Sequence, residues 1–230
     1  MGPVCTEHGG KPVHLSHGQT LESAPHVLHR TPLTNAPLSL ENRRPQGLGG
    51  SNPSPSASRA LRIVGGKFAG RDLTSPNDFR VRPTAEHVRA ALLDLLANDV
   101  KGARVLDLFA GTGALGLEAI SRGATSADFV ETRGSSLHAL RANIAMLRLR
   151  DQTRVFTKDA LPFAAALDPD TYDIAFADPP YGSRMLDRVV DTWRERKFSR
   201  VLAIEHATGH ELPRGRQTRT LDASSLTIYR

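Results

Sequence analysis

The stretch LDLFAGTGALGLEA, residues 106–119, decides the fold, because an apolar strand pattern runs into a glycine-rich turn and then into a helix pattern. The turn places Gly111, Gly113 and Gly116 in a GxGxxG arrangement, and Glu131 ends the next predicted strand. Glycines at such a turn let a ligand approach the backbone, and an acid one strand later can bind both hydroxyls of a ribose. The stretch predicts an α/β domain that binds a nucleoside-containing cofactor, unless the glycines only shape the turn.

Strand and helix patterns alternate on both sides of this stretch. The predicted strands are 103–109, 126–131, 153–159, 172–181 and 199–206, the predicted helices between them are 115–123, 137–148, 160–167 and 185–196, and two extended pieces follow at 216–222 and 225–230. Alternating strands and crossover helices require a mostly parallel sheet. The sequence therefore predicts a Rossmann-like α/β core with an antiparallel hairpin at its C-terminal edge.

A smaller unit precedes the core. Residues 61–73 read as a strand, a glycine-containing turn and a second strand, which is the pattern of a β-hairpin. A helix is predicted to begin at Pro83 and Thr84 and to end near Asn98. Its predicted apolar face consists of Val88, Ala91, Leu92, Leu95 and Leu96. Hairpin and helix (61–100) and the core (101–230) together make one predicted domain, 61–230.

The N-terminal residues 1–60 are rich in Pro, Ser, Gly, Asn and His and follow neither the helical nor the strand period. They are interpreted as a disordered, low-complexity tail. Their histidines lack the fixed, close spacing of a metal site, so no metal is expected.

Composition narrows the class of protein. The net charge of +6 and the pI near 10.0 favour a polyanionic partner such as RNA or DNA. The single cysteine, Cys5, excludes an internal disulfide framework. A single cysteine fits a reducing, cytoplasmic setting. We find neither a secretory signal nor a long apolar segment, so we expect no membrane partner. We also expect a monomer.

Asp107 distinguishes between the possible cofactors. The glycine pattern alone fits both a nicotinamide dinucleotide and S-adenosylmethionine. Asp107 ends the first core strand, where a carboxylate can bind the cationic amino-acid end of S-adenosylmethionine but repels a pyrophosphate. We therefore predict S-adenosylmethionine as cofactor, bound by Asp107, Phe109, Gly111, Gly113 and Glu131.

Asp159 follows the third strand, at the rim where α/β proteins bind ligands. A carboxylate there can hydrogen-bond the adenine amino group. The alternative is an N-cap for the helix that begins at Ala160, because Asp is a preferred capping residue. Both roles are compatible, and Asp159 completes the predicted cofactor site.

The fourth strand ends in Asp178, Pro179, Pro180 and Tyr181, which we assign as the catalytic turn. Two prolines stiffen the backbone and donate no hydrogen bond, so the turn presents acceptors. The Asp178 carboxylate and the Pro179 carbonyl can hold both hydrogens of an exocyclic base amine, and Tyr181 can stack on the base. An ordinary proline turn is the alternative interpretation.

Taken together, the hairpin, the Arg-Pro-Thr helix, the glycine turn and FADPPYG resemble the bacterial small-subunit ribosomal RNA (guanine-N2)-methyltransferases, from about Leu61 to the C-terminus. The resemblance implies a class I methyltransferase domain over 61–230 that methylates the N2 amino group of one guanine in 16S ribosomal RNA. The substrate is then ribosomal RNA or an assembling small subunit. Relatives commonly carry an acid after Arg89, and its absence leaves Arg89 without that partner.

Four basic residues before the core are candidate nucleic-acid contacts: Lys67, Arg71, Arg80 and Arg82. A solvated face is the alternative for each of them. His206, after the fifth strand, is interpreted as a solvated loop residue on the ligand rim. A base within a paired helix is hard to reach, so the target guanine is expected to be unstacked on binding.

Three other functions compete with this one. An NAD-dependent oxidoreductase fits the glycine pattern and Glu131 but not Asp107 or the catalytic turn. An inactive RNA-binding module of the same fold would not need the complete motif set. An adenine-N6 DNA methyltransferase shares the Asp-Pro-Pro-Tyr turn, although such enzymes usually carry a separate target-recognition region.

Overall fold

The computed structural model describes residues 61–76, 85–179 and 184–230, all within one compact unit of the chain, Pro53–Arg230. The strands are β1 (Arg104–Asp107), β2 (Ser126–Val130), β3 (Thr153–Phe156), β4 (Tyr172–Ala177), β5 (Ser199–Ala207), β6 (Gln217–Leu221) and β7 (Ser224–Tyr229). The α-helices are α1 (Glu86–Leu95), α2 (Ala97–Val100), α3 (Ala114–Ser121), α4 (Gly134–Met146), α5 (Ala160–Ala165) and α6 (Met185–Arg196), and the short 3-10 helices are η1 (Gly66–Phe68) and η2 (Arg150–Gln152).

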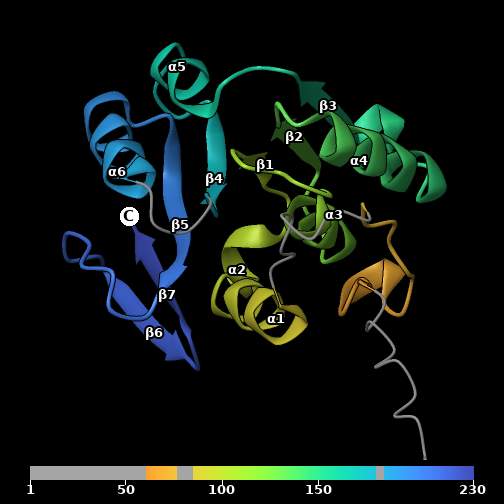
Figure 1. The fold of residues 1–230 in the computed structure, drawn as a ribbon, viewed down its shortest axis with the longest axis horizontal. Coiled ribbons are helices and arrows are strands. Elements are labelled where there is room, and N and C mark those ends of the chain that lie inside the picture. The colour runs from red at the N-terminus through yellow and green to blue at the C-terminus, as the bar shows by residue number, and fades with distance from the viewer. Residues whose placement is uncertain (1–60, 77–84, 180–183) are drawn as a thin grey trace, which may run out of the picture. The chain divides into compact units, whose positions relative to one another are not determined.

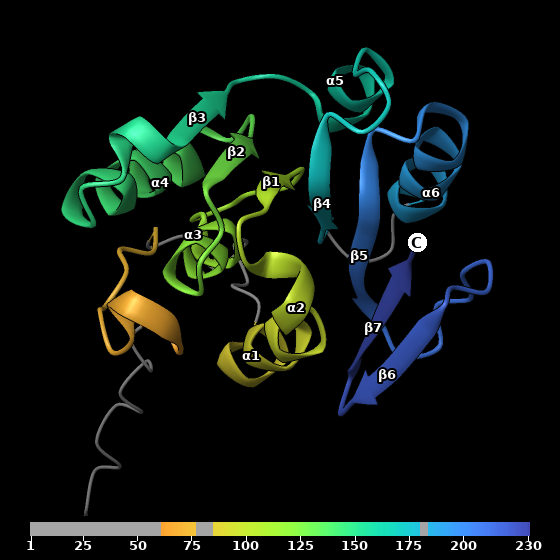
Figure 2. The same cartoon turned by 180° about the vertical axis from the view of Figure 1, so that it is seen from behind.

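The strands form one sheet in the order β3-β2-β1-β4-β5-β7-β6 (Figures 1 and 2). Neighbours from β3 to β5 are parallel, whereas β7 runs antiparallel to both β5 and β6. This confirms the predicted mostly parallel sheet with an antiparallel C-terminal edge. The strand order reverses between β1 and β4, and sheets of this kind bind ligands at the carboxyl ends of the strands near such a reversal.

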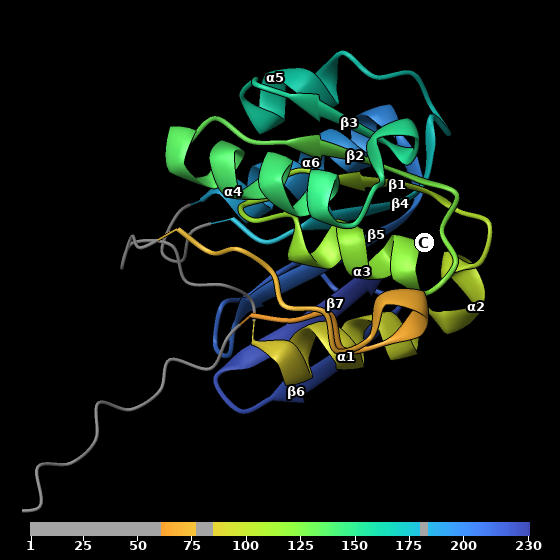
Figure 3. The ribbon, with the colours of Figure 1, turned by 90° about the vertical axis from the view of Figure 1, so that its right-hand side faces the viewer.

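Helices cover both faces of the sheet because successive strand residues point to opposite sides. Val105 of β1 packs into a cluster with apolar residues of α1, α3 and α4, whereas the next residue, Leu106, packs into a second cluster with α5 and α6. Figure 3 shows α3 and α1 on one side of the strands. Both clusters are almost fully buried, so the sheet has an apolar core on each of its faces.

The predicted hairpin is shorter than expected. Its two arms meet in an isolated antiparallel bridge between Arg62 and Asp72, rather than in two strands. Between the arms, the chain turns through η1 and docks on α3, where Ser121 Oγ accepts from the Phe68 amide (2.9 Å) and donates to the Gly65 carbonyl (2.6 Å). Backbone hydrogen bonds still join the two arms, because Ile63 N donates to the Arg71 carbonyl (2.9 Å) and Leu73 N donates to the Leu61 carbonyl (2.6 Å). The hairpin is therefore present in a short form that is docked on α3.

The helix that follows begins within the described residues at Glu86 and stops at Leu95, three residues before the predicted end, and α2 continues the chain. Leu96 interrupts it with φ −103° and ψ 13°. Val88, Leu92 and Leu96 are buried as predicted, together with Leu93. The predicted Ala91 and Leu95 are only partly buried. The predicted start at Pro83 and Thr84 lies outside the described residues.

The expectation that Arg89 lacks a partner is wrong. Its side chain is fully buried, and its Nε lies 2.6 Å from Oε2 of Glu118 on α3, whose side chain is also fully buried. Arg89 also donates to the carbonyl of Arg62. An acid 29 residues away in sequence therefore pairs with Arg89.

Within the described ranges, no helix is both long and apolar enough to span a membrane. The predicted tail, residues 1–60, lies outside these ranges.

Candidate active site

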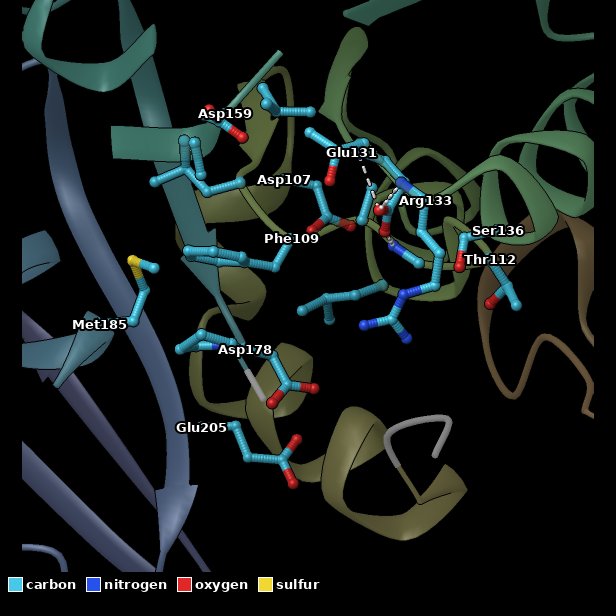
Figure 4. Close-up of a pocket in the computed structure, with 18 of the residues that line it drawn as sticks. Asp107, Phe109, Thr112, Glu131, Arg133, Ser136, Asp159, Asp178, Met185 and Glu205 are labelled. Atoms are coloured by element: carbon cyan, nitrogen blue, oxygen red, sulfur yellow. Dashed lines mark hydrogen bonds between the residues drawn. The ribbon is translucent and has the colours of Figure 1, made fainter. Parts of the chain in front are cut away.

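A cavity of about 770 Å³ lies along the carboxyl ends of β1, β2, β4 and β5 (Figure 4). Seven of the predicted site residues line it: Asp107, Phe109, Gly111, Glu131, Asp159, Asp178 and Pro179. Its volume is within the range of small-molecule and cofactor pockets. The structure thus brings the predicted cofactor residues other than Gly113, and the start of the predicted catalytic turn, to one pocket.

The glycine turn links β1 to α3. Gly111 and Gly113 have φ of 52° and 78°, in the left-handed region that disfavours other residues. Gly113 does not line the cavity. It lies beneath the turn, where a Cβ atom would come within 2.3 Å of Leu140 Cδ1. Gly111 therefore forms the pocket floor, and Gly113 lets the turn pack on α4.

Asp107 ends β1 with only 4% of its surface exposed. Its Oδ2 accepts a hydrogen bond from the Gly116 amide at 3.2 Å. Burial, reinforced by the nearby negative charge of Glu131, raises the pKa of Asp107 to about 7, although the amides of Gly116 and Phe109 oppose the rise. A cationic group that binds in the pocket would restore the ionised carboxylate, because opposite charges favour the charged form.

Glu131 follows β2 and orders the turn around it. Its Oε2 accepts from the Gly111 amide at 2.9 Å, and its Oε1 accepts from the amides of Thr132 and Arg133 at 2.8 and 2.7 Å. A carboxylate has about four acceptor sites, so this one retains capacity for a ribose hydroxyl. Three backbone bonds fix its position before any ligand arrives.

Asp159 occupies the N-cap position of α5, but its side chain makes no capping hydrogen bond. It lines the cavity instead. In Figure 4 it lies at the end of the pocket opposite Glu205. The capping role considered from the sequence is therefore not realised, and the carboxylate is available to a ligand.

The catalytic turn begins at Asp178, directly after β4. Asp178 is half-buried and Pro179 is buried, and both line the cavity. The predicted Pro180 and Tyr181 lie outside the described residues. Asp178 and Asp107 therefore belong to one pocket, at the ends of adjacent parallel strands.

Several lining residues escaped the sequence analysis. Among them are Arg133, Ser136, Lys158, Met185, Arg188, Glu205 and Ser224. Glu205 had a detectable signal, because it stands near the end of a predicted strand, as Asp107 and Asp178 do. Lys158 stands directly before Asp159 and Arg133 stands two residues after Glu131, on loops where charge is common and gives little signal.

Lys67 and Arg71 are exposed on and just after η1, and neither lines the cavity. Arg80 and Arg82 lie outside the described residues. Exposure is compatible with a nucleic-acid contact and equally with a solvated face.

His206 was interpreted wrongly as a solvated loop residue. It lies within β5 with 5% of its surface exposed, and its Nε2 is 3.0 Å from Thr227 Oγ1. Burial holds the pKa of His206 below its usual value. His206 thus has a structural role, because it is held between β5 and β7, and it does not line the cavity.

The chain is similar to known proteins over most of its described length. A family model described as Conserved hypothetical protein 95 matches residues 61–223. Ribosomal RNA small subunit methyltransferase D of Escherichia coli (strain K12) is 37% identical over 139 residues, which are 60% of this chain and 69% of that protein. The family model thus spans nearly all of the described residues.

Solved structures agree with the fold. The Escherichia coli protein yhhF superposes with a TM-score of 0.64 at 30% identity, covering 74% of this chain and 96% of that one. An RNA methyltransferase of Salinibacter ruber, solved with S-adenosyl-L-homocysteine, superposes with a TM-score of 0.53 at 16% identity, covering 64% and 92%. The fold is that of class I methyltransferases.

Proposed function

The chain belongs to the family described as Conserved hypothetical protein 95, with relatives named Ribosomal RNA small subunit methyltransferase D, and we propose that it methylates 16S ribosomal RNA. The methyl donor is S-adenosylmethionine, and the acceptor is the exocyclic N2 amino group of one guanine. One observation carries the proposal: a single cavity joins the buried Asp107 at the glycine turn to Asp178 and Pro179 after the neighbouring strand.

The residues present fit S-adenosylmethionine. Asp107 is a buried acid whose pKa burial raises to about 7, and the cationic amino group of the methionine part would favour its charged form. With the cofactor bound, Glu131 would accept from a ribose hydroxyl, and Asp159 would accept from the adenine amino group. A pyrophosphate at the same turn would face the Asp107 carboxylate, which disfavours a dinucleotide.

Asp178 and Pro179 act on the guanine. The lone pair of the N2 amine is delocalised into the ring, so the amine is a weak nucleophile. The Asp178 carboxylate and the Pro179 carbonyl accept one amine hydrogen each and orient the lone pair toward the methyl group. S-adenosylmethionine, when bound, would supply an electrophilic methyl group that N2 would take from the sulfonium sulfur, with release of S-adenosylhomocysteine. Asp178 accepts the proton that N2 then loses, directly or through water.

Transfer of label tests the proposal. Purified protein and S-adenosylmethionine labelled in its methyl group are incubated with one of three substrates. These are small subunits from cells that lack the enzyme, large subunits, and DNA. We expect label in 16S ribosomal RNA alone. Label in DNA alone would support the adenine-N6 alternative, and label in no nucleic acid would contradict the proposal.

A further inference from the structure

We propose that Glu205 recognises the target base by accepting a hydrogen bond from N1–H of guanine, and so selects guanine over adenine at the site of methyl transfer. The inference rests on the proposed function and assigns a specificity-determining residue to it. Asp178 and Pro179 do not supply this selection, because guanine and adenine each carry an amine with two hydrogens.

Glu205 lies level with the catalytic turn. β4 and β5 are parallel neighbours in which Ala177 pairs with Ile204, so the next residues, Asp178 and Glu205, stand side by side at the rim of the sheet. Both line the same cavity. Figure 4 shows Glu205 close to Asp178, and far from Asp159 at the opposite end of the pocket. Glu205 is therefore placed to meet the base that Asp178 holds, not the adenine of the cofactor.

The Glu205 carboxylate is buried and held in place. Only 5% of its surface is exposed, and Ser224 Oγ, from the adjacent strand β7, donates to Glu205 Oε1 at 3.0 Å. Burying a carboxylate is costly unless hydrogen bonds compensate for lost water. A carboxylate kept on the wall of a ligand pocket is thus a candidate for binding a donor group of the ligand.

Base chemistry decides which donor this is. In guanine the N2 amine is next to N1–H, so the two form a contiguous edge of donors. In adenine the N6 amine is next to an N1 that has no hydrogen and acts as an acceptor. An ionised carboxylate only accepts hydrogen bonds, so it binds the N1–H of guanine and is repelled by N1 of adenine.

The catalytic turn alone does not make this distinction. Asp178 and Pro179 offer acceptors to an amine, and the amines of guanine and adenine each present two hydrogens. A second acceptor, placed beside N1 of the base, distinguishes guanine, in which N1 carries a hydrogen, from adenine, in which it does not. Glu205 is the buried carboxylate that the described part of β5 contributes to this wall.

The test replaces the N1 donor of the substrate. Once the methylated position has been mapped, small subunits are reconstituted with ribosomal RNA that carries either guanosine or the 2-aminopurine ribonucleoside there. 2-Aminopurine keeps the 2-amino group but has no hydrogen on N1. Methylation rates are measured for the wild type, for Glu205→Gln, and for Glu211→Gln, a control at an exposed glutamate on the following loop.

We expect the wild type and the Glu211→Gln control to methylate guanosine about 100-fold faster than 2-aminopurine. In the 2-aminopurine complex two buried acceptors, the Glu205 carboxylate and N1 of the base, would face each other. The amide of Glu205→Gln can also donate, so we expect its preference to fall by at least about tenfold. Its affinity for S-adenosylmethionine, measured by calorimetry, should stay within about twofold of the wild type, because Glu205 lies away from the predicted cofactor residues.

Two results overturn the assignment of Glu205: a wild type that methylates both bases equally fast, or a Glu205→Gln variant with the wild-type preference. The first is measured without any variant, so it stands even if the substitution prevents folding. A wild type that methylates no guanosine in ribosomal RNA refutes the proposed function itself, and the recognition role of Glu205 with it.

Discussion

Arg89 and Glu118 form a fully buried ion pair with an Nε–Oε2 distance of 2.6 Å. The pair connects α1 to α3, the helix that begins at the glycine turn. Glu118 also accepts from Arg122 at 2.9 Å and from the amide of Val64 at 3.3 Å. One carboxylate thus joins α1, the segment around Val64 and α3.

Replacement of Arg89 by Met should destabilise the protein strongly. It leaves Glu118 buried without its closest cation, and breaking a buried pair in this way typically costs about 3 to 5 kcal/mol. The free energy of unfolding is measured by urea titration. Arg62→Met is the control, because Arg62 is half-exposed and lies 3.6 Å from Glu86, and such a pair contributes at most about 1 kcal/mol. Equal losses in the two variants would contradict the account.

The sequence predicted the layers of the fold but not this pair. The alternation of strand and helix patterns was sufficient for the parallel sheet, since each pattern is local. The partner of Arg89 is 29 residues away on another helix, and only tertiary packing brings the two together. The same reason explains His206, whose burial depends on the pairing of β5 with β7.

Asp107→Asn should stabilise the protein without ligand at high pH. The pKa of Asp107 is about 7 in the folded protein, above the ordinary value of 3.8. Its contribution to stability is therefore complete below about pH 4 and lost as the pH rises through 7. Asparagine does not titrate, so its advantage over aspartate should grow between about pH 4 and pH 7 and level off above pH 7, at about 4 kcal/mol. Thermal unfolding across this pH range measures the difference.

The same variant should bind S-adenosylmethionine more weakly, by about tenfold or more, because it loses the charge that pairs with the amino group. Calorimetry at about pH 8 measures the affinity. A variant that is more stable and also binds the cofactor as tightly as the wild type would show that Asp107 does not contact the cofactor.

Asp159→Ala separates the two roles considered for this residue. Loss of an N-cap would cost about 1 kcal/mol, but the side chain makes no capping bond, so we expect a stability change within about 0.5 kcal/mol. Affinity for S-adenosylmethionine should fall by about tenfold with the lost adenine contact. Asp168→Ala, at an exposed loop position, serves as the control. Reduced stability with unchanged affinity would favour the capping role.

Lys67→Ala and Arg71→Ala should weaken RNA binding in a salt-dependent way. If each side chain contacts a phosphate, each variant should reduce the slope of log affinity against log salt by about 1. Filter binding of 16S ribosomal RNA at several salt concentrations measures this slope. Arg194→Ala, at an exposed position on α6, should leave it unchanged. Equal slopes for all four proteins would identify Lys67 and Arg71 as part of a solvated face.

The predicted site shows the same division between local and long-range information. Asp107, Glu131 and Asp178 were found because an acid after an apolar strand is visible in the sequence. Glu205 stands near the end of an apolar strand, yet its place beside Asp178 depends on β5 lying next to β4 in parallel. Strand order and register are properties of the assembled sheet, so the position of Glu205 beside Asp178 could not be predicted from the sequence.

The central claim is that the Asp178 turn transfers a methyl group to N2 of guanine in 16S ribosomal RNA. The most direct test digests the labelled RNA to nucleosides and identifies the modified nucleoside by mass spectrometry, for the wild type and for Asp178→Ala. The account predicts N2-methylguanosine with the wild type, and at least about 100-fold less with the variant. Label in N6-methyladenosine, or equal N2-methylguanosine from both proteins, would contradict it.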